Sequence, residues 1–236
     1  MKSSSTIKQC HQRSKRLALA IMDAGIKLVA VDFDRTIVNI HTGGRYKQSA
    51  SMLSSHYRPF FKKFLKEAQK VGLWVAVVTF SAQTALVADS MSIALGGESN
   101  INRCYLRGDD GSWVRPSNFN VTSNWRGRDM SRGKLGHIYS VCDHIQKLSN
   151  ETISPTEILY IDDDLANVDI GRKAGICHSA WCPATYEPNS CNKLLWFELE
   201  GKYLNGIPLN VMSNTAEVED EFKDGNRTKT RLCSVM

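Results

Sequence analysis

Two aspartates separated by one residue follow a short apolar run near the start of the chain. The run covers residues 28–31, includes two valines, and leads directly into Asp32 and Asp34. Consecutive apolar residues with β-branched members predict a short buried strand. Ligands of open α/β sheets bind at the carboxyl ends of the strands, so both carboxylates would lie where a substrate can reach them. The alternative is a strand that simply runs into an aspartate-rich turn.

Three consecutive aspartates follow a second apolar run. Residues 158–161 are apolar and precede Asp162, Asp163 and Asp164. Adjacent carboxylates repel one another unless a positive group lies among them. Asp164 is predicted to cap the helix that follows it. For Asp163 we favour a metal site, because Mg²⁺ selects hard carboxylate oxygens and leaves room for water.

Together with two further motifs, these runs resemble the four signatures of the haloacid dehalogenase-like (HAD) hydrolase superfamily. The first, DxDx[T/V], is matched by residues 32–36, and the second, an apolar strand ending in Thr or Ser, by residues 75–79. Lys134, ahead of a helical pattern, is the candidate for the third. Residues 158–167 match the fourth, with paired acids and Asn167 four residues on. The resemblance spans roughly residues 25 to 182.

The resemblance assigns catalytic roles. Asp32 would be the nucleophile that forms an aspartyl-phosphate, and Asp34 would protonate the leaving oxygen and then activate water. Thr79 would donate a hydrogen bond to a phosphate oxygen, unless it is an ordinary strand-end threonine. Lys134 would offset the negative charge of Asp32 and of the phosphoryl group, with Arg132 as the substitute if this lysine is merely solvated.

The resemblance also implies a cofactor, Mg²⁺. Its ligands would be a side-chain oxygen of Asp32, the backbone carbonyl of Asp34 and a side-chain oxygen of Asp163. Asp162 would support these ligands without binding the ion, and Asn167 would orient either the ligands or Lys134. Family members that dehalogenate lack the second aspartate of the first motif, and the ATP-driven pumps replace it and need membrane spans. The phosphatase branch is therefore the expected one.

Short apolar runs that alternate with helical patterns predict an α/β fold with a doubly wound parallel sheet. The resemblance adds a Rossmann-like core and a flap hairpin after Thr36, with little or no cap domain. We expect an N-terminal helix within residues 1–26, a phosphatase domain over 27–212 and a flexible tail over 213–236. Residues 97–133, including a predicted hairpin around the Asp-Asp-Gly turn at 109–111, are the expected site of specificity.

The composition bears on the cellular compartment in which the protein is expected. The 236 residues are 42% hydrophobic and hold seven scattered cysteines without CxxC spacing, which indicates reduced thiols and a cytoplasmic location. Residues 1–22 carry five basic residues and no acidic one, which is also typical of a mitochondrial transit peptide, but an amphipathic helix packed on the sheet is favoured. No apolar stretch is long enough to predict a membrane span.

The partner is expected to be a phosphorylated substrate. Members of the superfamily without a cap often act on phosphoproteins or nucleic-acid ends, and small phosphate esters are the alternative. A non-catalytic HAD-fold binding protein is a further alternative. Arginines interleaved with tryptophans between residues 113 and 132 could contact nucleic acid, but an ordinary solvated loop is favoured, and a net charge of +6 is too small to indicate nucleic acid by itself. The sequence does not predict an oligomeric state.

Overall fold

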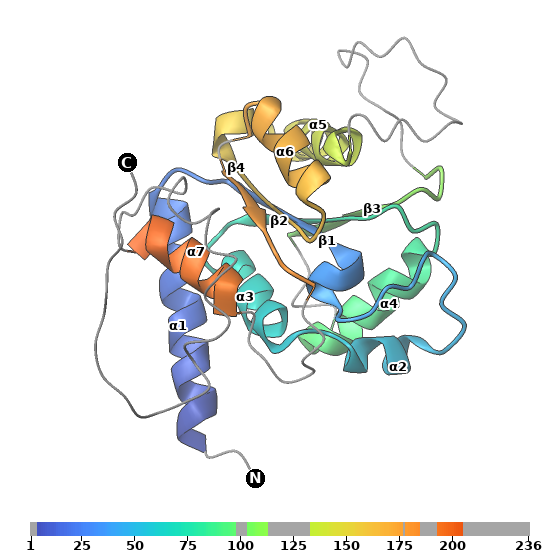
Figure 1. Ribbon diagram of the computed structural model, residues 1–236. Coiled ribbons are helices and arrows are strands. Elements are labelled where there is room, and N and C mark those ends of the chain that lie inside the picture. The colour runs from blue at the N-terminus through green and yellow to red at the C-terminus, as the bar shows by residue number, and fades with distance from the viewer. Residues whose placement is uncertain (1–3, 98–102, 113–132, 177, 185–192, 205–236) are drawn as a thin grey trace, which may run out of the picture.

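The computed structural model describes the whole chain except residues 1–3, 98–102, 113–132, 177, 185–192 and 205–236. The described residues form a five-stranded parallel sheet in the order β3-β2-β1-β4-β5 (Figure 1). Helices lie on both faces, which confirms the predicted α/β doubly wound sheet. The strands are β1 (Leu28–Asp32), β2 (Trp74–Val78), β3 (Cys104–Arg107), β4 (Ile158–Asp162) and β5 (His178–Trp181).

The helices form two layers (Figure 1). One face of the sheet is covered by α1 (Ser4–Asp23), α2 (Ala50–Ser55), α3 (Pro59–Lys70), α4 (Thr84–Leu95) and α7 (Lys193–Leu204), and the other by α5 (Leu135–Ser149) and α6 (Leu165–Lys173). Asp164 caps α6 as predicted, accepting a hydrogen bond from the backbone N–H of Ala166 at 2.8 Å. None of the described helices combines the length and apolarity that crossing a bilayer requires.

The alternation of side chains along β1 decides which layer each one meets. Val29 and Val31 belong to the core beneath α1 and α3, whereas Leu28 and Ala30 belong to the core beneath α5. Because successive side chains of a strand point to opposite faces, Asp32 lies on the α5 face. Asp162, the last residue of β4, lies on the same face, because Ile158 and Tyr160 of that strand also belong to the core beneath α5. The ends of both strands therefore direct a carboxylate toward the beginning of α5.

The segment after β1 differs from the predicted flap hairpin. Phe33–Ile37 form a kinked turn, in which Asp34 has an extended backbone (φ −68°, ψ 130°) and Arg35 has a positive φ of 59°. The loop that follows has one isolated bridge, between Val38 and Tyr57, instead of a two-stranded ladder. The physical reason lies in the partners of the loop backbone: the side-chain amide of Gln83 accepts from the N–H of Tyr46 at 2.7 Å and donates to its carbonyl at 3.0 Å. The side chain of Gln83 thus provides the hydrogen bonds to the backbone of Tyr46 that a second strand would otherwise provide.

Two further predictions concern the segments around β3 and the C-terminus. The run at 104–107 is a strand, but it pairs in parallel with β2 at the edge of the sheet, and the second arm expected of the hairpin lies outside the described residues. The expected flexible tail at 213–236 also lies outside the described residues. Between β1 and β2 the described chain holds a loop, α2 and α3, and no separate cap domain.

Helix α7 contacts β5 through a buried histidine. His178 is 1% exposed, and its Nδ1 lies 2.8 Å from the hydroxyl of Tyr203. Its Nε2 lies 3.5 Å from Oε1 of Glu198. Burial lowers the pKa of His178 to about 2 and raises the pKa of Glu198 to about 7. At neutral pH the pair is therefore a neutral imidazole beside a carboxyl that is partly protonated.

These two pKa shifts predict opposing effects of pH on stability. Below its ordinary pKa of 6.5, His178 takes up a proton only in the unfolded chain, so stability falls as pH falls. Between pH 7 and 4.5, Glu198 holds a proton more firmly in the folded chain, so stability rises as pH falls. Relative to wild type, Glu198→Gln should lose up to about 1.4 kcal/mol of unfolding free energy per pH unit as pH falls from 7 to 4.5, and His178→Asn should gain as pH falls below 6.5. Urea denaturation at several pH values measures both slopes, and slopes of the same sign in the two variants would contradict the prediction.

Candidate functional site

The ends of three neighbouring strands meet at one edge of the sheet. Asp32 is the register partner of Val78, so Thr79 follows at the same edge on one side of β1, and β4 ends at Asp162 on the other side. The chain passes from β1 to β2 and β3 in one direction along the sheet, whereas β4 and β5 lie in the opposite direction. This reversal beside β1 is the place where open α/β sheets bind ligands.

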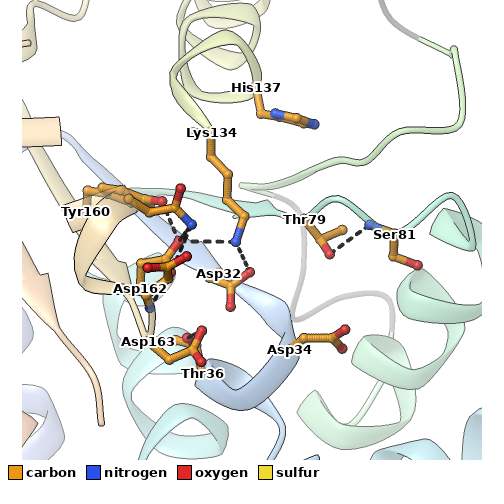
Figure 2. Close-up of polar contacts among 12 residues, drawn as sticks. Asp32, Asp34, Thr36, Thr79, Ser81, Lys134, His137, Tyr160, Asp162 and Asp163 are labelled. Carbon is orange, nitrogen blue, oxygen red and sulfur yellow. Dashed lines mark hydrogen bonds and ion pairs between the residues drawn. The ribbon is translucent and has the colours of Figure 1, made fainter. Parts of the chain in front are cut away.

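Lys134 lies between carboxylates from two strands (Figure 2). Its ammonium donates to Oδ1 of Asp32 and, at 3.1 Å, to Oδ2 of Asp162. The lysine is 5% exposed, and burial alone would lower its pKa, but the attraction of the two carboxylates outweighs burial and raises the pKa. Lys134 therefore stays charged and holds the ends of β1 and β4 together.

A tight turn before α5 brings Lys134 to this position. Lys134 precedes the first residue of α5, and Gly133 before it has a positive φ of 49°. A side chain at residue 133 would place its Cβ 2.5 Å from Oδ1 of Asn167. Glycine at this position thus allows the turn to pack directly on α6. This close packing places Lys134 within reach of Asp32 on β1 and Asp162 on β4.

Asp162 is already surrounded by donors. The hydroxyl of Tyr160 and the side-chain amide of Asn167 donate to it, the latter at 3.2 and 3.3 Å. The backbone N–H of Asp164 adds a bond of 2.8 Å, and Lys134 supplies the ion pair. With its oxygens occupied in this way, Asp162 is suited to anchoring the site rather than to binding an ion or a substrate.

Asp32, Asp162 and Asp163 present carboxylate oxygens within 4.8 Å of one another. Burial raises the pKa of Asp32 well above its ordinary value although Lys134 acts to lower it, and burial followed by the charge of Asp162 raises the pKa of Asp163. Three carboxylates thus face one ammonium, which leaves an excess of negative charge away from water. A hard divalent cation fits this set, and Asp32 and Asp163 are the carboxylates that remain for it.

Asp34 lies at the border of this group and faces a loop (Figure 2). Its two carboxylate oxygens accept from the hydroxyl of Thr42 at 2.8 and 2.9 Å, and one accepts from the backbone N–H of Gly43 at 3.1 Å. His41 lies 3.3 Å away through Nδ1. The carboxyl of Asp34 is therefore held on the opposite side of the turn from Asp163, apart from the three clustered carboxylates (Figure 2).

Thr79 borders the group on the β2 side. Its hydroxyl oxygen accepts from the backbone N–H of Ser81 at 3.1 Å, which orients the hydroxyl at the strand end. The intervening ring of Phe80 lies 5.1 Å from the ammonium of Lys134 and 5.7 Å from the ring of His137. His137 in turn lies 3.1 Å from Asp109 through Nε2. An aromatic and polar wall therefore stands next to the carboxylates.

The predicted site residues fall into three groups in the structure. One connected network contains Asp32, Lys134, Asp162, Asp163 and Asn167, Asp34 and Thr79 lie at its borders, and Arg132 lies outside the described residues.

Several contributors carried no clear signal in the sequence. Thr36, which donates to Asp163 at 3.4 Å, belongs to the first motif but had no role assigned to it. Tyr160 precedes Asp162 by two residues in a predicted strand, so alternation could have placed its hydroxyl on the same face. Thr42 and His137 reach the site only through tertiary structure.

Comparisons with known proteins add little at the level of sequence. No family model matches the chain, and no curated protein is significantly similar to it. A solved structure of a candidate 3-deoxy-D-manno-octulosonate 8-phosphate phosphatase from Vibrio cholerae is 18% identical, with a TM-score of 0.36 over 66% of this chain. The chain spans 64% of the length of that protein.

We predict that Lys134→Met lowers the unfolding free energy by about 3–5 kcal/mol, because the substitution leaves two buried carboxylates without their shared cation. The loss should shrink as pH falls, since the unpaired carboxyls then take up protons. The matched control is Lys147→Met in α5, the helix that Lys134 precedes. Lys147 pairs with Asp143, but its side chain is 73% exposed, so its loss should lower the unfolding free energy by less than about 1 kcal/mol. Urea denaturation checks both, and equal losses in the two variants would contradict the assignment.

Proposed function

We propose that the protein is a Mg²⁺-dependent phosphomonoester hydrolase of the HAD type that acts through an aspartyl-phosphate on Asp32. The observation that carries the proposal is the buried ammonium of Lys134 shared by Asp32 and Asp162, with Asp163 completing a carboxylate group within 4.8 Å. The order of the four motifs along the chain supports the same assignment.

The chemistry of a phosphate monoester explains why such a group is needed. The negative charge of the ester repels a nucleophile, so an enzyme must supply positive charge and hold an attacking oxygen in line with the leaving oxygen. Bound Mg²⁺ would supply part of that positive charge. Lys134 fixes one oxygen of Asp32, which leaves the carboxylate oriented for attack on phosphorus. The hydroxyl of Thr79 would donate to a phosphoryl oxygen from the β2 side.

Asp34 is proposed as the general acid and base. When the bond from phosphorus to the leaving oxygen breaks, its carboxyl proton passes to that oxygen; in the second half, the carboxylate takes a proton from the water that attacks the aspartyl-phosphate. Thr42 and Gly43 hold the carboxyl on the loop side, two residues from the nucleophile. This arrangement separates proton transfer from the cation site.

The proposed substrates are phosphoryl groups on macromolecules. The described chain between β1 and β2 contains a loop and two helices and forms no folded lid over the strand ends. Without a folded insert at this place, the strand ends would admit a phosphorylated side chain that projects from a protein surface. Small phosphate esters, such as nucleotides or sugar phosphates, are the competing class, and a comparison of kcat/KM between phosphopeptides and these metabolites separates the two.

We predict that the purified protein releases phosphate from p-nitrophenyl phosphate in the presence of Mg²⁺ and loses this activity with EDTA. Asp32→Asn should abolish turnover, because an amide cannot form the phosphoenzyme. Asp34→Asn should lower kcat by about 10²–10⁴-fold, the usual contribution of a general acid and base. Asp143→Asn, a partly exposed aspartate on α5, is the matched control and should retain wild-type turnover. Turnover is measured by the absorbance of the p-nitrophenol that is released with the phosphate, at the same protein concentration for each variant.

Two outcomes would count against the proposal. Equal turnover in wild type and Asp32→Asn would place the activity elsewhere or in a contaminant. A folded wild-type protein that binds Mg²⁺ and phosphopeptides but releases no phosphate would favour the non-catalytic binding protein instead.

A further inference from the structure

A buried arginine lies beneath the site, and no carboxylate of the described residues pairs with its charge. Arg58, the residue before α3, is 4% exposed. Within the described part of the chain its guanidinium makes no ion pair, and its Nε is buried without a hydrogen-bond partner. Removal of an arginine side chain from water is costly, so a buried guanidinium of this kind indicates a specific task.

The guanidinium bridges two loops that are far apart in the sequence. Nη2 donates to the carbonyl of Arg35 in the turn after β1, and Nη1 donates to the carbonyl of Pro183 after β5 at 3.0 Å. Nη1 also lies 3.6 Å from the sulfur of Cys182. In Figure 1 the end of β5 lies beside the turn that follows β1. One planar side chain thus joins the two segments.

Each of these segments is attached to a carboxylate of the site. Arg35 directly follows Asp34 and has a left-handed backbone, with φ of 59°. Such a conformation is uncommon for a residue with a side chain and persists only where contacts hold it. The bond from the guanidinium to the carbonyl of Arg35 is a contact of this kind, so it bears on the direction of the Asp34 carboxyl.

The β5 segment is attached in the same way to the end of β4. The backbone N–H of Cys182 donates to the carbonyl of Asp162 at 2.8 Å. The indole of Trp181 donates to the carbonyl of Asp163 at 2.9 Å. The arginine therefore connects the turn that carries Asp34 to the segment that carries Asp163.

We propose that Arg58 is a positioning residue, which sets the separation between the Asp34 turn and the Asp163 segment by donating to one carbonyl in each loop. The inference rests on the proposed phosphatase function, for which that separation sets the distance between the acid and base and the cation ligand. The task needs a guanidinium, because its planar fork reaches two acceptors at once. A lysine keeps the charge but presents a single nitrogen that cannot hold both carbonyls in this geometry.

The test compares Arg58→Lys and Arg58→Met with wild type. The matched control is Arg103→Lys, because Arg103 also donates to a backbone carbonyl, that of Gly72 at 2.6 Å, but does so at the opposite end of the sheet. Two readouts are taken: kcat and KM for p-nitrophenyl phosphate with Mg²⁺, and amide hydrogen exchange along the chain. Exchange requires no activity, so it tests the bridge even if the proposed function is wrong.

In Arg58→Lys we expect kcat to fall by about 10²-fold with KM nearly unchanged, because misplacement by about 1 Å acts on the transition state. Protection should fall at least tenfold in residues 35–40 and 181–184 and stay unchanged in β2. Arg103→Lys should alter neither readout there. Unchanged protection of the two segments in Arg58→Lys, or a protection loss spread evenly over the sheet, overturns the inference. If wild type shows no turnover, the phosphatase proposal fails and exchange alone decides whether Arg58 holds the loops.

Discussion

The structure depends on one buried ammonium. Lys134 has to reach Asp32 on β1 and Asp162 on β4 at once, and each of these three charges would be costly to bury alone. Their mutual attraction therefore constrains the elements that carry them. Strands β1 and β4 must end at the same level, and α5 must begin directly above these ends. Gly133 and the packing of its backbone on Asn167 are the local means by which that beginning is fixed.

The same group bears on the proposed binding of a cation and of a phosphate ester. The ammonium offsets one of three carboxylates, and the nearby guanidinium of Arg58 is occupied by backbone carbonyls. A phosphoryl group would be repelled by what remains. In the proposed function, a divalent cation held by Asp32 and Asp163 would offset this negative charge, so the phosphate ester would be expected to bind after the cation. The proposed order of binding thus follows from charge balance.

The sequence predicted the features that local patterns control. Apolar runs predict the strands of the sheet close to their observed bounds. Asp164 is predictable as the cap of α6, because a short polar side chain there precedes a helical pattern. The meeting of Asp32 and Asp162 followed from a general rule, since parallel strands share one carboxyl edge.

Features that depend on distant side chains could not be predicted in this way. The loop after β1 is not a hairpin because Gln83, from the start of α4, pairs with the backbone of Tyr46. Helix α2 is short and polar, and its clearest marker is a hydrogen bond from Met52 to the side chain of Ser49. Arg58 precedes a proline at a helix start and looks like any surface arginine until the fold brings two loops to it.

In the proposed function Asp34 both gives and takes a proton, and its contacts suit this double role. Gly43 offers an N–H, which can only donate to a carboxyl oxygen. Thr42 offers a hydroxyl, which donates to the carboxylate while its oxygen accepts from Gly44 at 3.3 Å. In the proposed acid form of Asp34, the same hydroxyl can rotate and accept the carboxyl hydrogen. A threonine at this position therefore suits both halves of the proposed reaction, whereas a second backbone N–H could only donate.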